Sequence, residues 1–114
     1  MMQIIEIASL KPPSGGSPRF EGYLYGAKTS FFVVNSPKGH GADKHRHPYE
    51  EIFVVLGGDI EVIVDGELQR IEPGHIVIIP PNTWHEFKNR AEEPALMVNI
   101  HAAQTMIQED WNPS

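Results

Sequence analysis

The sequence contains no cysteine, so it can form neither a disulfide framework nor a thiolate metal site. Any bound metal ion must therefore take nitrogen and oxygen ligands. No stretch approaches the roughly 18 consecutive apolar residues of a membrane-spanning helix, and the first residues, MMQIIEIASLKPPSGG, lack a basic segment followed by a long apolar one. We therefore expect no membrane association and a cytoplasmic location.

Positive charge is also scarce. Nine lysine and arginine residues stand against 15 aspartate and glutamate residues, which gives a formal net charge of −6 at pH 7. Because a surface that binds nucleic acid carries the opposite sign, we expect no nucleic-acid partner. Hydrophobic residues make up 40% of the chain and charged residues 21%, a composition typical of folded globular proteins. The 114 residues match the size of one ordinary domain, so we expect a single domain over residues 1–114.

Glycine and proline, ten of each, recur between short apolar runs, and this spacing predicts an all-β fold of short strands and tight turns. Asp65-Gly66 lies between two alternating segments and predicts a two-residue type I′ hairpin, because both central positions of that turn need positive φ. The other predicted strands are residues 30–35, 51–56, 75–79, 85–88 and 96–101, with 4–7 and 20–25 as further candidates.

Two segments do not fit the strand pattern. Residues 11–18 contain three prolines, two glycines and two serines, which predicts a loop without regular structure, either a plain connector or a flap over a site. Residues 102–110 show no alternation, so we expect a short helix or an extended arm, anchored by Trp111.

Four residues have the chemistry of a metal site. His45 and His47 are two apart, so on an extended strand both imidazoles project from one face. Glu51 opens the apolar run IFVVL, where a buried carboxylate is costly unless a cation compensates it, and His85 starts another predicted strand. Three imidazoles and one carboxylate suit one divalent transition-metal ion, namely Fe, Mn, Ni, Zn, Co or Cu. In octahedral geometry two positions stay open for a ligand.

The spacing of these residues resembles the two sequence motifs of the cupin family. The first motif covers residues 39–58 and reads Gly39, His45, His47, Glu51 and Gly58. The second covers residues 74–89 and reads Gly74, Pro80, Asn82, His85 and Asn89. Asn82 stands where the family has glycine, a mild departure because asparagine tolerates a left-handed backbone. The resemblance implies an antiparallel double-stranded β-helix, the cupin or jelly-roll barrel, and metal binding through both motifs.

The resemblance leaves the activity open, because the family includes oxygenases, isomerases, lyases, decarboxylases, storage proteins and sensor domains. We expect a metal-dependent enzyme of oxygenase or isomerase type that acts on a small polar metabolite. The alternative is a non-catalytic module that binds or senses a small ligand in the same barrel. The resemblance also implies a homodimer, for which the apolar residues 4–7 could supply an edge strand.

Some residues near the motifs are candidates for substrate contacts. Phe53 shares a strand face with Glu51 and could line the pocket wall. Asn99 and His101 share one face of the last predicted strand with Met97, opposite an apolar face. If the polar face points inward, Asn99 and His101 contact the substrate or support the metal ligands; otherwise they are exposed or face a second copy.

The remaining candidates have plainer interpretations. His40 and His75 lie in predicted turns and are expected to face water. Trp84 and Phe87 flank His85 and are expected to pack the barrel. The sequence offers no clear general acid or base beyond a metal-bound water.

Overall fold

Short antiparallel strands form almost all of the regular structure, as the glycine and proline spacing predicted. The computed structural model describes residues 2–113. Within that range the strands are β1 (Arg19–Phe20), β2 (Ser30–Ser36), β3 (Gly41–Arg46), β4 (Glu51–Gly57), β5 (Ile60–Val64), β6 (Glu67–Ile71), β7 (Ile76–Ile79), β8 (His85–Asn89), β9 (Ala95–His101) and β10 (Glu109–Asp110). Two short 3₁₀ helices, η1 (Ile7–Leu10) and η2 (Gly22–Tyr25), lie in the N-terminal region.

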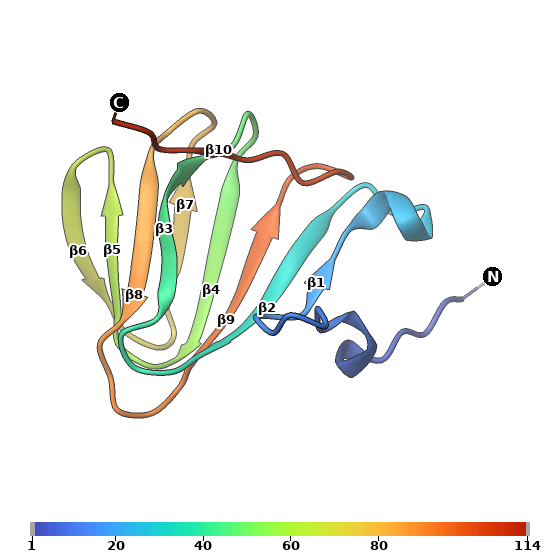
Figure 1. The fold of residues 1–114 in the computed structure, drawn as a ribbon, viewed down its shortest axis with the longest axis horizontal. Coiled ribbons are helices and arrows are strands. Elements are labelled where there is room, and N and C mark those ends of the chain that lie inside the picture. Colours follow the sequence, from blue (N-terminus) through green and yellow to red (C-terminus); the bar gives the residue numbers. More distant parts are fainter. Residues whose placement is uncertain (1, 114) are drawn as a thin grey trace.

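The strands form two five-stranded sheets that face each other (Figure 1). Sheet A has the order β1-β2-β9-β4-β7, and sheet B has the order β10-β3-β8-β5-β6. All pairs are antiparallel, and β9 lies between β2 and β4 while β8 lies between β3 and β5. Strands distant in sequence therefore alternate within each sheet, which is the arrangement of a jelly roll, or double-stranded β-helix. This confirms the predicted fold class.

The structure confirms the predicted strands of the two motifs and of the last strand. Each of β2, β4, β7, β8 and β9 agrees with its predicted range to within one residue at either end. Asp65 and Gly66 have φ values of 50° and 79°, and they connect Val64 to its partner Glu67 as the type I′ hairpin requires. Asn82 has a φ of 58°, so asparagine takes the left-handed position where the family has glycine.

The two N-terminal strand predictions are wrong as made. Residues 2–6 have no regular structure and η1 begins at Ile7, because no neighbouring strand pairs with the segment 4–7. Of residues 20–25, only Phe20 belongs to a strand. Gly22 then donates its backbone N–H to Oγ of Ser30, and Gly26 has a left-handed φ of 74°, so the chain turns through η2 instead of extending.

The two non-strand segments behave as predicted. Residues 11–18 form turns and bends without regular structure. The segment after β9 is the extended arm rather than the helix: β10 pairs with β3, and the backbone N–H of Trp111 donates to the carbonyl of Lys44 at 3.0 Å. The indole of Trp111 packs edge-on against Trp84. The arm therefore lies across the end of the barrel where the metal motifs meet (Figure 1).

The hydrophobic core fills only part of the space between the sheets. Its buried members are Val34, Phe53, Val55, Ile60, Val62, Ile79, Phe87, Ala95 and Met97. Gly58 of the first motif closes this region: a Cβ there would lie 2.9 Å from Cα of Ala95, and its φ is 93°. Eight further described side chains are buried and polar, among them His45, His47, Glu51 and His85, and these four form a polar site beside the core. Among the described residues, no helix is long and apolar enough to cross a membrane.

Candidate metal centre

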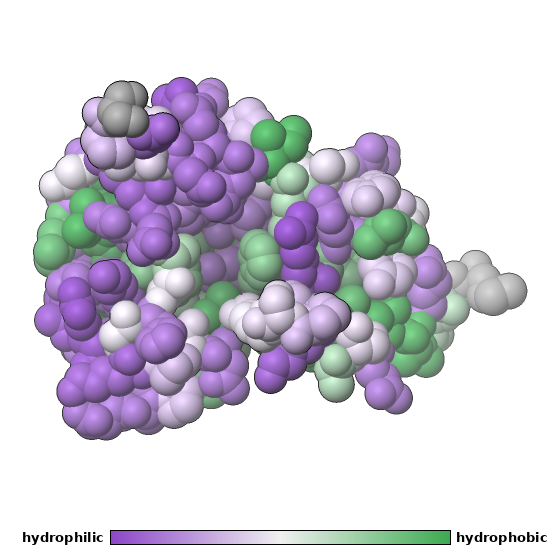
Figure 2. Space-filling model, viewed as in Figure 1, coloured by the Kyte–Doolittle hydropathy of each residue, from purple (hydrophilic) through white to green (hydrophobic). Residues whose placement is uncertain are grey.

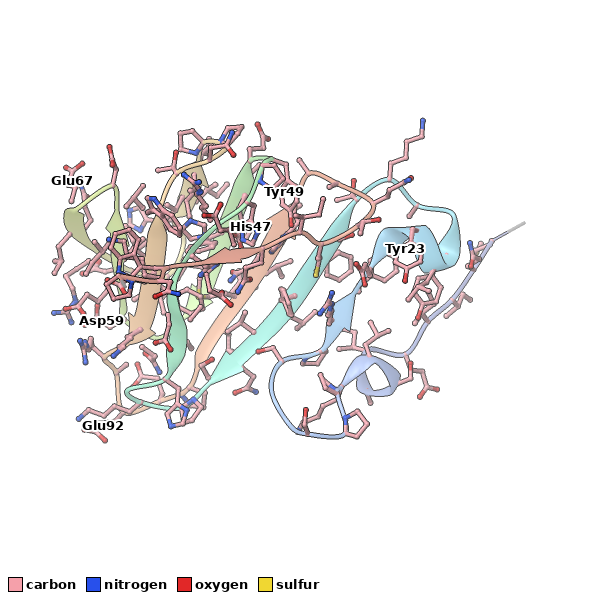
Figure 3. The ribbon with its side chains drawn as sticks, turned by 45° about the horizontal axis from the view of Figure 1, so that its top comes forward. Tyr23, His47, Tyr49, Asp59, Glu67 and Glu92 are labelled. Carbon is pink, nitrogen blue, oxygen red and sulfur yellow. The ribbon has the colours of Figure 1, made fainter. Side chains whose placement is uncertain are left out.

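The four residues predicted to bind a metal come together at one end of the barrel. His45 on β3 and His85 on β8 are directly opposite in the pairing of sheet B, while Glu51 opens β4 of sheet A. His47 lies one residue beyond the end of β3. All four side chains are buried, and one donor atom from each lies within 4.8 Å of the others. Figure 3 shows His47 at this end of the sheets, beside Tyr49.

Each of the three histidines uses its Nδ1 in the same way. The Nδ1–H of His45 donates to the carbonyl of Asp43 at 2.5 Å, that of His47 to the carbonyl of Ile107 at 2.7 Å, and that of His85 to the carbonyl of Thr83 at 2.9 Å. A neutral imidazole has one N–H, so in all three rings Nε2 keeps a free lone pair. Metal-bound histidines have this arrangement, since a backbone carbonyl commonly fixes the ring through its other nitrogen.

The Nε2 atoms of His47 and His85 lie next to the carboxylate of Glu51. Its Oε1 lies 3.1 Å from Nε2 of His47 and 3.0 Å from Nε2 of His85, although the buried Nε2 of His47 has no properly aligned hydrogen-bond partner. With neutral rings, these contacts set lone pairs against a negatively charged oxygen, which is repulsive unless a cation lies among them. Two donors that bind one ion at about 2.1 Å and at right angles lie about 3.0 Å apart. The residues present therefore fit a divalent metal ion.

The pKa values of these groups in the metal-free protein follow from the same contacts. Burial disfavours the charged form of His47, but Glu51 and the carbonyl of Ile107 outweigh burial and raise its pKa above 6.5. Burial lowers the pKa of His45, which the carbonyl of Asp43 only partly offsets. Burial alone would raise the pKa of Glu51, yet the surrounding imidazoles hold it well below its usual range. Without a metal ion, a proton on His47 supplies part of the missing positive charge.

His101 lies in the same cluster but has the opposite hydrogen-bond pattern. Its Nδ1 is 2.6 Å from the hydroxyl of Tyr49, and its Nε2 is 3.2 Å from Oε2 of Glu51. The Tyr49 oxygen accepts the backbone N–H of Ile107 at 3.3 Å, and burial raises the pKa of Tyr49 to about 12, so the hydroxyl keeps its proton and donates it to Nδ1. The proton of His101 is then on Nε2, which donates to Glu51 and cannot bind a metal ion at the same time.

The polar face of β9 points inward, which is one of the two orientations that the sequence left open. Asn99 is 4% exposed and His101 is 2% exposed, and both line a cavity of about 190 Å³ that adjoins His45 and Glu51. Phe53, predicted to line the pocket wall, is buried in the core instead, where its ring packs edge-on against Phe87 at 5.4 Å. It is not among the residues that line the cavity. His40 and His75 are exposed, as predicted.

Sequence reasoning missed Tyr49 and most of the cavity wall. Tyr49 is two residues before Glu51, so strict alternation continued backwards from β4 would have placed both side chains on one face. Phe32 and Val34 line the cavity from β2, at alternate positions that point inward. The order of the sheets was needed to bring β2 beside β9. The surface is hollowed near the centre of Figure 2, where Figure 1 shows β4 and β9 behind the space between β3 and β2.

The family model described as "Cupin domain" matches residues 32–101, more than half of the chain. The chain belongs to the cupin family. The matched range contains all four candidate ligands together with Asn99 and His101, so every proposed metal ligand of this cupin lies within the family domain.

Three similar proteins illustrate how far this likeness reaches. Gentisate 1,2 dioxygenase 1 of Aquipseudomonas alcaligenes is 37% identical over 62 residues, which cover 54% of this chain but 18% of that protein. A Klebsiella pneumoniae protein described as uncharacterized, with a double-stranded β-helix domain, superposes with a TM-score of 0.73 at 21% identity, over 96% of each chain. Oxalate decarboxylase of Lactobacillus farciminis superposes with a TM-score of 0.82 at 20% identity, over 93% of this chain and 35% of that one. The two structural matches show a shared fold. The chain spans less than a fifth of the dioxygenase.

Proposed function

We propose that this cupin is a metal-dependent enzyme that binds one divalent transition-metal ion through His45, His47, Glu51 and His85 and acts on a small polar molecule. The observation that carries the proposal is the environment of Oε1 of Glu51, which lies 3.0 Å from Nε2 of His85 and 3.1 Å from Nε2 of His47 inside the barrel, while Nδ1 of each ring is directed at a backbone carbonyl. When both rings are neutral and protonated on Nδ1, their Nε2 lone pairs repel the carboxylate. A bound cation removes that repulsion, and iron, manganese, cobalt, nickel, copper and zinc all accept this set of donors.

The cavity beside the candidate centre supports a role in binding small molecules rather than a purely structural one. A closed structural site leaves no coordination position free, whereas four protein ligands in an octahedral ion leave two. His45 and Glu51 lie on the wall of the 190 Å³ cavity, so a molecule in the cavity lies next to the ion. A bound ion of this class would polarise an oxygen of the substrate or take part in oxygen chemistry. The likeness to a gentisate dioxygenase supports oxygenase over isomerase chemistry.

The alternative is a cupin that binds or senses a ligand without turning it over. It is supported by the small number of titratable groups in the cavity: of the described residues that line it, only His45, Glu51 and His101 carry an ionisable side chain. Two of these are candidate ligands, and the third donates to one of them. A reaction that needs a separate general acid or base would have none in place.

Metal analysis and turnover test the two possibilities in sequence. The protein is purified anaerobically, loaded separately with Fe(II), Mn(II) and Zn(II), dialysed, and analysed for metal per chain. We expect one ion per chain, and failure to retain any ion would contradict the proposal. Oxygen uptake by the Fe(II) form, tested against a panel of phenols and hydroxy acids, then separates an oxygenase from a binding module. Uptake that disappears in the His85→Ala variant identifies an enzyme.

We also propose that residues 1–114 form one domain that pairs with a second copy, in the cytoplasmic location expected from the sequence. The segment 4–7 is no strand, so the outer face of sheet A is the better candidate for the contact. Among the described residues of β2, β9, β4 and β7, the side chains that point outward are apolar, apart from Asn35. The most exposed of these apolar side chains are Leu56, Ile76 and Ile78. Two chains of net charge −6 approach with least repulsion through an uncharged face.

Light scattering tests the pairing. A homodimer gives about twice the 12.8 kDa of one chain, and the charged substitution Ile78→Glu is expected to convert it to the monomer. The matched control Leu68→Glu lies on exposed β6 of sheet B and is expected to leave the mass unchanged. A wild-type mass of one chain at micromolar concentration contradicts the proposal.

A further inference from the structure

The cavity next to the candidate metal centre has walls of a definite chemical kind. Phe32 and Val34 reach it from sheet A, and Ala42 and Phe87 reach it from sheet B, so apolar side chains face each other across it. An apolar cavity of about 150 Å³ holds a benzene molecule. The 190 Å³ available here therefore accommodates one ring with a few substituent atoms.

Positive charge is missing from these walls. Of the described residues that line the cavity, none is lysine or arginine. Arg19 lies near the rim, with its guanidinium 6.0 Å from the centre of the Phe32 ring, but it is paired with Glu21 at 3.3 Å. A divalent ion bound beside Glu51 and three neutral imidazoles leaves one net positive charge. The site therefore compensates one negative charge on a ligand, and a second would lie among apolar side chains.

Two buried asparagines, Asn89 and Asn99, differ in how many of their hydrogen-bonding groups have a partner. Asn89 is fully satisfied: its amide donates to the carbonyls of Ser36 and Glu93, and its oxygen accepts from the backbone of Asp59 and Ala91. Asn99 is also buried, yet its Oδ1 has no hydrogen-bond partner. Buried amide groups are rarely left unpaired in proteins, since the lost hydration is not replaced. The free side chain of Asn99 lines the cavity and is placed to bind a ligand atom.

We infer that the cavity takes a compact ring-bearing molecule with at most one negative charge, which presents oxygen atoms to the metal ion and a hydroxyl or carbonyl group to Asn99. The inference rests on the proposed metal-dependent function. It narrows the small polar metabolite expected from the sequence to molecules with an apolar ring between Phe32 and Phe87, and it disfavours compact dicarboxylates. Asn99 is then a specificity residue, because its amide pairs only with a ligand that carries the matching polar group.

Catechol and oxalate distinguish the two ligand classes, because each offers two adjacent oxygen donors to a metal ion but only catechol has a ring. Titration calorimetry and the visible absorption of the Co(II) form are measured for both compounds under anaerobic conditions. We expect catechol to bind at least about tenfold more tightly than oxalate and to change the absorption spectrum. Tighter binding of oxalate overturns the inference, and this comparison needs no variant.

A pair of variants then tests Asn99. Asn99→Leu is expected to weaken about tenfold the binding of pyrogallol, which keeps a third hydroxyl for Asn99 when two oxygens bind the ion, while the metal content stays the same. Asn35→Leu, the same change at an exposed position on β2, is the control and is expected to have no effect. Unchanged pyrogallol affinity in a metal-loaded Asn99→Leu protein contradicts the role of Asn99. Failure of the wild-type protein to bind Co(II) would instead contradict the proposed function, so the two failures are distinguishable.

Discussion

The two sheets contribute different chemistry to the same site. Sheet B carries His45 and His85, with His47 just beyond its strand, and each of these rings is fixed through Nδ1 by a backbone carbonyl. Sheet A carries the carboxylate of Glu51 and the ring of His101, whose Nε2–H donates a hydrogen bond to that carboxylate. The histidines that supply nitrogen donors are thus oriented by backbone carbonyls. Glu51, which supplies the negative charge, is instead contacted by side chains. We expect the sheet B histidines and Glu51 to decide whether the ion binds, and the supporting His101 of sheet A to decide how tightly.

Removing a proposed ligand from either sheet tests the strongest form of this comparison. His85→Ala deletes a nitrogen donor, and Glu51→Gln deletes the one negative charge, so each is expected to weaken metal binding more than 100-fold. Elemental analysis after dialysis measures the loss. His75→Ala is the control, because His75 is exposed and its Nδ1 contacts only the carbonyl of Glu72. Full metal occupancy in His85→Ala, or loss of metal in His75→Ala, would mean that the ligand set is wrong.

Lowering the pH is expected to act through the histidines and not through the carboxylate. The pKa of His47 is raised above 6.5 in the metal-free protein and that of His45 is lowered, so His47 takes up a proton before His45 as the pH falls and competes with the ion. The pKa of Glu51 is held well below its usual range, so the carboxylate stays charged. Metal affinity measured against a competing chelator should therefore fall by about tenfold per pH unit for each histidine that titrates below neutral pH. A metal affinity that is unchanged between pH 7.5 and 5.5 would contradict the proposal that histidines bind the ion.

His101 tests the supporting half of the comparison. Replacing it with alanine removes the donor to Oε2 of Glu51 but none of the proposed ligands, so metal affinity should fall by about 10- to 100-fold and not vanish. His101→Gln, which keeps an N–H donor, should recover part of the loss. A fall as large as that of His85→Ala would indicate that His101 binds the ion itself.

Tyr49→Phe is expected to give the smallest effect. It removes the hydroxyl that fixes the proton of His101 on Nε2, and the ring can then turn or change tautomer. We expect a loss of a few-fold in metal affinity, together with an altered absorption spectrum of the Co(II) form. An unchanged spectrum would show that the hydroxyl does not influence the centre.

The four candidate ligands could be found from the sequence because their residue types and spacing match the two cupin motifs. His45 and His47 are two apart, Glu51 follows after a proline, and His85 begins a strand after another turn. The strands and the hairpin were equally accessible, since Gly and Pro mark their ends. The absence of a strand at residues 4–7 could not be predicted from the sequence. The segment is apolar, but whether a strand lies beside it to pair with depends on the whole fold.

The inward face of β9 could not be predicted because the outward face of this strand is the more apolar of the two. Its apolar residues Leu96, Val98 and Ile100 point outward, while Asn99 and His101 are buried. Hydrophobic alternation predicts the opposite orientation when an interior is purely apolar. Only the pairing of Glu51 with His101 across β4 and β9 shows that a polar site occupies this part of the interior.

The C-terminal arm gives the protein a built-in optical reporter. The chain has two tryptophans, Trp84 beside the candidate ligand His85 and Trp111 on the arm, and their rings lie 5.3 Å apart in an edge-on contact. The same arm supplies the Ile107 carbonyl that fixes His47. Because indole emission depends on neighbouring rings and on contact with water, any release of the arm that accompanies metal exchange registers as a change in intrinsic fluorescence. The state of the centre can thus be followed in the native protein without an added label.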